Sequence, residues 1–254
     1  MKTGNLLSLA FFVLLTVFWA IISKLGIWDA TLFPSPMKVG EALWQGIADG
    51  SLLYATGVSL RRVLIGYLIS LSMGVPLGIL LARSRVADKT IGLLVMGLQA
   101  LPSICWLPLA LLWFGLNDTA ILFVIVMGSL LTLSTSVRDG IKNISPTYLR
   151  AAQTMGTRPL SLYLEVLLPA ALPSLLTGAK LGWAFAWRSL MAGELLFVSM
   201  GLGHRLMMGR ELADMSQVIA VMLVIIGLGL LTDNEIFGVL EDQVRERWGL
   251  SGQR

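Results

Sequence analysis

Long stretches without a charged residue set the strongest limit on what this chain can fold into. Five gaps between consecutive charged residues hold 18 to 28 uncharged, mostly apolar residues: 3–23, 63–82, 90–117, 119–137 and 215–232. A helix that crosses a bilayer needs about 20 such residues. The gaps therefore predict five membrane-spanning helices and exclude an ordinary water-soluble globule.

A sixth span is predicted over residues 170–198, although it contains Lys180, Arg188 and Glu194. Charges inside a membrane helix are costly and usually face a protein interior or a water-filled cavity. Without this span, the polar segments on either side of it would lie on the same side of the membrane. The predicted spans, within one membrane domain over residues 1–254, are 6–23, 63–82, 90–115, 119–136, 170–198 and 215–232.

Composition supports an all-α polytopic membrane protein. The chain is 56% hydrophobic and only 13% charged, whereas soluble domains have roughly 25% charged residues. Backbone groups in lipid have no water partner, so the spans should be helical. Residues 6–22 and 122–133 lack the alternation of a membrane β-strand. The first stretch is longer than the apolar core of a signal peptide, so we expect a retained helix.

The distribution of lysine and arginine predicts the orientation. With the N-terminus in the cytoplasm, eleven basic residues fall on the cytoplasmic side, six on the opposite side and two in the fifth span. Positive charge accumulates in short cytoplasmic loops. We therefore predict that both termini are cytoplasmic. The net charge of +4 then reflects membrane orientation, and no nucleic-acid partner is expected.

The sequence lacks the common motifs for nucleotide or metal chemistry. It contains no G-x-x-x-x-G-K-[ST] phosphate loop and no H-E-x-x-H pair, and His204 is its one histidine. We expect the chain to bind no metal or cofactor and to hydrolyse no ATP by itself. Energy for uphill transport would then come from an ion gradient or from a partner protein.

The predicted cytoplasmic loop, residues 137–169, is the most informative stretch. Ser145-Pro146-Thr147 indicates a helix start, and Gly156 can end a short helix over Tyr148–Met155. A turn at Arg158-Pro159 then leads to a second amphipathic helix, which stops at Pro169. The alternative is an amphipathic helix lying on the membrane surface.

The loop resembles the cytoplasmic EAA loop of bacterial ABC importer permeases, whose pattern is E-A-A-x3-G-x9-I-x-L-P. Here Arg150-Ala151-Ala152 is followed by three residues, Gly156, nine residues and then Val166-Leu167-Leu168-Pro169. Arg150 stands where the family has glutamate, which reverses a charge. Other segments, such as Leu32-Phe33-Pro34-Ser35-Pro36, are similar to the nitrate/sulfonate/taurine branch, over roughly residues 30–248.

The resemblance implies a permease subunit in a bacterial inner membrane that carries a small anionic solute such as a sulfonate, taurine, nitrate or bicarbonate. Its implied partners are a second permease (the same or a different chain), two ATPase subunits that bind ATP and Mg, an extracytoplasmic solute-binding protein, and membrane lipid. The implied ATPase-coupling residues are Tyr148, Arg150, Ala151, Ala152, Met155, Gly156, Arg158 and Pro169. The alternatives are a gradient-driven secondary transporter and a membrane-embedded enzyme.

Candidate residues of the translocation pathway are Arg188, Glu194, Trp183, Trp187, Pro102 and Pro108. Arg188 could attract an anion, or it could be a structural charge paired with Glu194 across two subunits. Lys180 can extend toward the membrane interface. The two tryptophans could gate or simply pack, and the two prolines could break the third span or only kink it.

Two small-x3-small pairs, Gly74/Gly78 and Gly178/Gly182, permit close helix approach. We interpret them as packing within one subunit rather than as a dimer seam.

Overall fold

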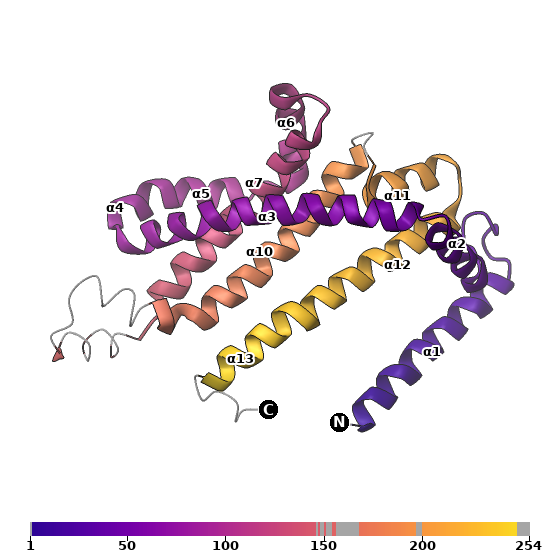
Figure 1. Ribbon diagram of the computed structural model, residues 1–254, viewed down its shortest axis with the longest axis horizontal. Helices are drawn as coiled ribbons and strands as arrows, with labels where there is room; N and C mark the ends of the chain where they lie inside the picture. Colours follow the sequence, from indigo (N-terminus) through magenta and orange to yellow (C-terminus); the bar gives the residue numbers. More distant parts are fainter. Residues whose placement is uncertain are drawn as a thin grey trace. The chain divides into compact units, whose positions relative to one another are not determined.

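The computed structural model describes residues 2–145, 147, 150, 154–155, 168–196 and 200–247, and the regular elements among these residues are helices (Figure 1). In chain order they are α1 (Lys2–Lys24), α2 (Pro36–Ala48), α3 (Ser51–Arg83), α4 (Arg85–Ala87), η1 (Asp88–Gly92), α5 (Leu93–Gln99), η2 (Ser103–Trp106), α6 (Leu107–Phe114), α7 (Asp118–Lys142), α10 (Leu168–Leu196), α11 (Leu202–Glu211), α12 (Met215–Leu231), η4 (Thr232–Gly238) and α13 (Val239–Arg247). This confirms the predicted all-α class.

The chain divides into two compact units. The first comprises Met1–Ser59 and Val198–Leu228, and the second comprises Leu60–Phe197 and Gly229–Arg254. In the first unit, the Trp19 indole donates a hydrogen bond to the Pro34 carbonyl at 3.1 Å. The Leu202 amide donates to the Ser59 hydroxyl at 2.9 Å, which joins α11 to the beginning of α3.

Helix α3 is longer than the predicted span 63–82, because it begins at Ser51 and runs for 33 residues. Asp49, just before it, accepts hydrogen bonds from the Ser51 hydroxyl and amide, and these bonds lower the pKa of the Asp49 carboxyl. The charge-free gap starts only after Arg62, but Arg62 does not end the helix. Its side chain is buried and paired with carboxylates, as described below.

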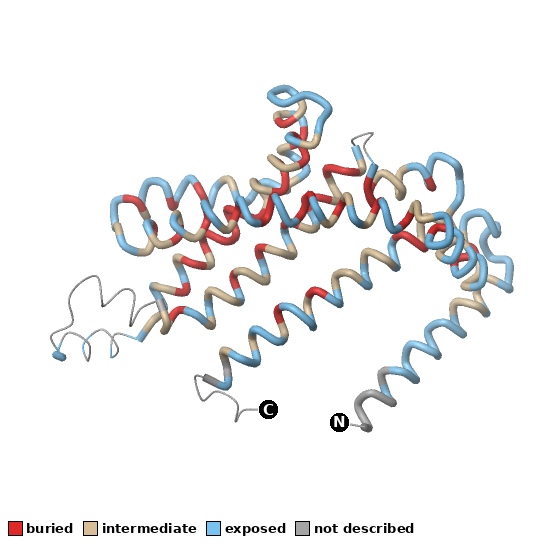
Figure 2. Tube along the Cα trace, in the orientation of Figure 1, coloured by how far each residue is buried: buried red, intermediate tan, exposed pale blue. Residues whose placement is uncertain are grey.

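Helix α7 is the centre of the second unit. Its buried residues include Ile121, Val124, Ile125 and Leu133, and Figure 2 shows buried positions along much of its length. These side chains form one apolar core with Val63 of α3, Leu107 of α6 and Leu190 of α10. Burial on several sides of one helix is what a central helix of a membrane bundle requires.

Glycines allow α3 and α10 to approach α7 closely. A Cβ atom at Gly78 would lie 2.6 Å from the Ser134 carbonyl oxygen, and one at Gly178 would lie 2.6 Å from the Ser136 Cβ. Gly74 and Gly182 also face α7, against Leu130 and Leu133. Both small-x3-small pairs therefore pack within the chain, as we interpreted them.

Among the residues that the structure describes, three helices are long and apolar enough to cross a membrane: Ser51–Arg83, Asp118–Lys142 and Met215–Val244. The segments Arg85–Gln99 and Ser103–Phe114 pass the same test together, as a broken span or a re-entrant loop. In α1 the apolar stretch Leu9–Lys24 is shorter. The 29-residue α10 is long enough but carries Lys180, Arg188 and Glu194.

The predicted span 90–115 is broken. The two segments on either side of residues 100–102 differ in direction by 101°. Pro102 lies at the break, with no amide hydrogen to donate, and it disfavours the helical conformation in the residue before it. Pro108 lies in the first turn of α6, where proline is tolerated. The structure thus decides for a break, at Pro102, rather than for one long kinked helix.

Candidate translocation site

A cavity of about 270 Å³ lies in the second unit at the break between α5 and η2, and we call it the break cavity. It is lined by Gln99, Ala100, Leu101, Pro102, Ser103, Met127, Gly128, Leu131, Thr132, Phe185 and Arg188. These residues come from the break itself, from α7 and from α10. Arg188, a predicted pathway residue, is the one charged side chain among them.

Arg188 is exposed, and its guanidinium carbon lies 5.4 Å from the centre of the Phe185 ring. A cation over an aromatic face is stabilised by the ring quadrupole. Within the described part of the chain, Arg188 forms no ion pair. Arg188 and Glu194 form no ion pair with each other among the described residues, and the pairing across two subunits that the sequence suggested stays a prediction.

Glu194 is fully buried and pairs with Arg62 instead, at 2.8 Å between Oε1 and Nη1. The second terminal nitrogen of Arg62 lies 2.6 Å from the Asp118 carboxylate, at the start of α7. Arg61 lies 3.4 Å from the same carboxylate, and its side chain is 69% exposed. We call these four residues the charge cluster; it joins α3, α7 and α10. Glu194 is therefore held by the fold and does not line the break cavity.

The sequence analysis does not identify Arg62 as a buried residue, because the charge-free gap that predicts the span begins only after it. A signal was present: residues 50–60 contain no charged residue, so Arg61-Arg62 interrupts a longer apolar stretch. A charge within such a stretch needs a buried partner. Glu194, in another apolar stretch, is a matching candidate.

Trp183 is a packing residue in this structure. Its indole nitrogen donates to the Thr232 hydroxyl at 3.3 Å, and its ring meets the Tyr67 ring edge-on at 5.2 Å between centroids. Trp187 stacks on Trp183 at 6.4 Å. Among the described residues, the buried indole N–H of Trp187 has no acceptor. The two tryptophans of α10 therefore pack toward neighbouring helices, beside a second cavity.

This second cavity, of about 640 Å³, lies between α10 and the segment Gly229–Glu241. Arg188 also borders it, but so do Lys180, Asp233 and Glu241. Lys180 has an acidic partner here, because its amine lies 2.9 Å from the Asp233 carboxylate, and its extension toward the membrane interface stays a prediction. The two carboxylates make this cavity less suited to an anion than the break cavity.

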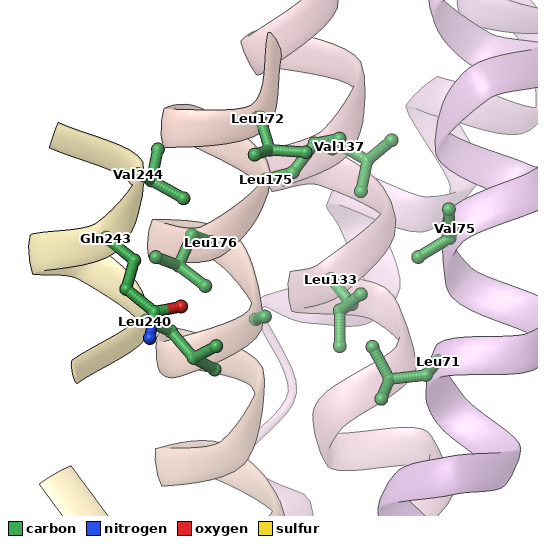
Figure 3. Close-up of a pocket in the computed structure, with 11 residues that line it drawn as sticks. Leu71, Val75, Leu133, Val137, Leu172, Leu175, Leu176, Leu240, Gln243 and Val244 are labelled. Atoms are coloured by element: carbon green, nitrogen blue, oxygen red, sulfur yellow. The ribbon is translucent and has the colours of Figure 1, made fainter. Parts of the chain in front are cut away.

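A third cavity, of about 400 Å³, is apolar (Figure 3). Leucine and valine side chains from α3, α7, α10 and α13 line it, together with Ala179 and Gln243. Figure 3 shows Leu71, Val75, Leu133 and Leu176 around this space. None of the described residues that line this cavity is charged, so it is not suited to bind an ionic solute.

The predicted coupling loop is described only in part. Arg150 and Met155 are exposed, and the Thr154 hydroxyl donates to the Arg150 carbonyl at 2.7 Å, a spacing typical of a helical turn. Pro169 is the second residue of α10. The remaining predicted coupling residues, Tyr148, Ala151, Ala152, Gly156 and Arg158, lie outside the described residues.

The helices that flank this loop, α7 and α10, pack closely against each other. A Cβ atom at Gly140, near the end of α7, would lie 2.8 Å from the Ser174 Cβ, near the start of α10. At the same end of α7, Lys142 and Arg138 both face the Asp88 carboxylate of η1. A displacement of the loop would therefore act on α7 and α10 together.

A helical membrane bundle with a broken helix and a cavity that contains polar side chains, as in the described residues, is typical of membrane transport proteins. Residues 74–237 match the family described as "Binding-protein-dependent transport system inner membrane component", and the chain belongs to this family. It is a permease subunit of an ABC importer, an integral membrane protein that works with ATPase subunits and a solute-binding protein. The predicted family is thereby confirmed.

The chain is similar to a putative ABC transporter permease of Methanocaldococcus jannaschii, with 35% identity over 75% of this chain and 72% of the relative. It is 29% identical to the taurine transport system permease protein TauC of Escherichia coli, over 87% and 82% of the two chains. It is 28% identical to the nitrate import permease protein NrtB of Leptolyngbya laminosa, over 93% and 86%.

The fold is similar to that of a solved structure of the MetNI methionine ABC transporter in an inward-facing conformation. The TM-score is 0.66 at 19% identity, and the match covers 77% of this chain and 95% of the other. At this identity the likeness supports the fold alone, and it agrees with the helical arrangement described above.

Proposed function

We propose that this chain is one half of a paired permease core that imports a small anionic solute, in a complex with two ATPase subunits and an extracytoplasmic binding protein. ATP and Mg bind to the ATPases, and this chain binds no cofactor. The complex lies in a bacterial inner membrane, with both termini of this chain in the cytoplasm. The solute class comprises sulfonates, taurine, nitrate and bicarbonate. The functions named for the taurine and nitrate relatives support this class.

One observation carries the coupling mechanism: the loop over residues 143–167 joins two helices that pack against each other without a gap. Gly140 meets Ser174, and Gly178 meets Ser136, so α7 and α10 form one rigid pair. Packed helices move as bodies rather than deforming continuously. An ATPase that grips the loop therefore moves both helices, and α10 carries Arg188 with it.

The proposed sequence of events is a rigid-body switch. ATP binding draws the two ATPases together, the two coupling loops follow, and the paired helix bundles open toward the binding protein. The binding protein selects the solute, and the permease supplies the passage. A ligand shifts such an equilibrium only by its differential affinity for the two states.

The test uses vesicles that contain the permease with its ATPases, together with the binding protein encoded beside it. We expect uptake that requires ATP and survives collapse of the ion gradients. Gly156→Leu should abolish uptake or detach the ATPases. Gly40→Leu is the matched control, because a Cβ atom added at Gly40 meets no atom within 4 Å. Gradient-driven uptake, or normal assembly and uptake in Gly156→Leu, would contradict the proposal.

A further inference from the structure

Three ionisable side chains lie in α10, and they differ in how their charge is balanced. Glu194 is paired with Arg62 at 2.8 Å, and Lys180 is paired with Asp233 at 2.9 Å. Arg188 has no carboxylate within ion-pair distance in the part of the chain that is described. An unbalanced charge in a membrane helix is costly and marks a solute or ion pathway more often than a structural role.

The surroundings of Arg188 at the break cavity are suited to an anion. None of the described residues that line it is acidic, and Gln99, Ser103 and Thr132 supply its uncharged polar groups. The Gln99 side-chain oxygen lies 3.3 Å from the Thr135 hydroxyl, and the Gln99 side chain also carries two N–H groups that can donate. Hydroxyl and amide donors next to a guanidinium are the groups that bind oxyanions.

The break itself makes room for this cavity. Pro102 ends the regular helix, and the 101° change of direction separates α5 from the segment that follows. Gly128 of α7 lies opposite, where an added Cβ would be 3.3 Å from the Ser103 Cβ and 3.1 Å from the Ser189 Cβ. Irregular backbone at membrane depth occurs where it lines a cavity.

We propose that the break cavity holds the oxyanion group of the transported solute, with the Arg188 guanidinium as its counter-ion and Gln99, Ser103 and Thr132 as hydrogen-bonding groups. Sulfonate, nitrate and bicarbonate each carry two or more oxygens on one central atom, which a guanidinium binds through two parallel hydrogen bonds. The volume of about 270 Å³ is sufficient for a small solute. This inference rests on the proposed function.

A thiol-modification experiment tests the charge of the cavity directly. Cys105, the single cysteine, is replaced by serine, and Ser103→Cys is introduced in the complete complex. The introduced thiol is treated with the anionic sulfonatoethyl methanethiosulfonate and with its cationic trimethylammonioethyl counterpart, and each rate is normalised to that of a free thiol. We expect the anionic reagent to be favoured. Arg188→Gln should shift the ratio of the two rates toward the cation on the order of tenfold.

The matched control is Arg61→Gln, which removes the same charge from a side chain that is 69% exposed and does not line the cavity. It should leave the ratio unchanged. Taurine, nitrate and bicarbonate, added in turn, are the probes of occupancy, and at least one should slow the anionic reagent when Arg188 is present. An unchanged ratio in Arg188→Gln overturns the proposal. If Arg188→Gln does not assemble, the test is the effect of the three anions on the complex with Arg188 intact. The proposal is overturned if none of the three slows the anionic reagent.

Uptake separates this inference from the proposed function. If the wild-type complex imports none of these anions with ATP, the proposed function fails. If it imports one, and Arg188→Gln imports it with the same KM and maximal rate, only the break cavity is refuted. We expect the Arg188→Gln complex to retain its ATPases and to lose about tenfold or more in uptake at low solute concentration.

Discussion

Arg62 shows how one residue can hold three helices of a membrane bundle together. Its side chain is 5% exposed, and its two terminal nitrogens contact Glu194 of α10 and Asp118 at the start of α7. Removing one member of a buried ion pair leaves the other member charged and desolvated, which costs more than the pair itself contributes. The charge cluster therefore determines which helix ends lie together rather than adding much net stability.

Substitution of Glu194 tests this interpretation. Glu194→Ala should lower the free energy of unfolding by about 1–3 kcal/mol, because Arg62 loses its fully buried partner and keeps only the partly exposed Asp118. The double variant Arg62→Leu/Glu194→Leu should be less destabilised than Glu194→Ala, because neither charge remains buried. Thermal unfolding of the purified complex, followed by tryptophan fluorescence, provides the measurement.

Arg61→Gln is the control for the charge cluster. Arg61 lies 3.4 Å from Asp118 but is 69% exposed, and exposed ion pairs contribute about 0–1 kcal/mol. Equal losses in Glu194→Ala and Arg61→Gln would show that burial of the charge is not what matters. A double variant as unstable as Glu194→Ala would show that the pair itself contributes more than its desolvation costs.

At the scale of elements, helix positions follow from charge-free gaps only where the charges that bound the gap also lie at the ends of the helix. The predicted span 119–136 lies within α7, which is bounded by Asp118 and Lys142. The predicted ends at residues 63 and 232 lie inside longer helices, because Arg62 and Asp233 are paired with Glu194 and Lys180. A single sequence does not reveal which charges meet in space, and this limits the prediction.

The break at Pro102 could be predicted from the sequence, but the polar residues that line the break cavity could not. Two prolines in one long apolar stretch indicate an interruption, and Pro102 produces it while Pro108 begins the next helix. Arg188 was a candidate as a charge in an apolar stretch. Gln99, Ser103 and Thr132 are ordinary polar residues in the sequence, and only folding brings them to Arg188.

Close packing against α7 gives a prediction about α3. A Cβ at Gly78 would lie 2.6 Å from the Ser134 carbonyl oxygen, a backbone atom that cannot turn away. Gly78→Ala should therefore destabilise the protein by about 1–3 kcal/mol, the usual cost of overpacking. Gly57→Ala, in the same helix but with no atom within 4 Å, should be neutral or slightly stabilising because alanine favours helix.

The two glycine variants are compared by their unfolding midpoints. These are measured by size-exclusion chromatography after heating. Similar midpoints for Gly78→Ala and Gly57→Ala would mean that α3 and α7 can separate without cost.

At the scale of the whole molecule, a single chain leaves many large apolar side chains exposed. Leu7 and Leu14 of α1 are 73% and 71% exposed, and Leu112 of α6 is 81% exposed. Figure 2 shows exposed positions along much of the described part of α1. In a membrane protein these side chains meet lipid or another subunit, so they are no defect of packing. The chain is thus built for an apolar environment on most of its surface.

The transport cycle depends on which parts of the chain move together. Gly140 of α7 and Ser174 of α10 approach so closely that a Cβ on Gly140 would lie 2.8 Å from the Ser174 Cβ. A disulfide needs about 3.5–4.5 Å between Cβ atoms, so the two helices must separate slightly to accept cysteines here, and the reduced double variant is the reference for that cost. In a Cys105→Ser background, Gly140→Cys/Ser174→Cys then locks α7 to α10 on oxidation.

If α7 and α10 move as one rigid pair, the lock constrains nothing that the cycle uses. ATP-driven uptake in vesicles should then be equal before and after oxidation of the same double variant, with reduction by dithiothreitol as the internal control. Loss of uptake on oxidation and its return on reduction would instead mean that the two helices separate during each cycle. In that case a loop that joins them could not act as a simple lever, and the ATPase would have to drive each helix separately.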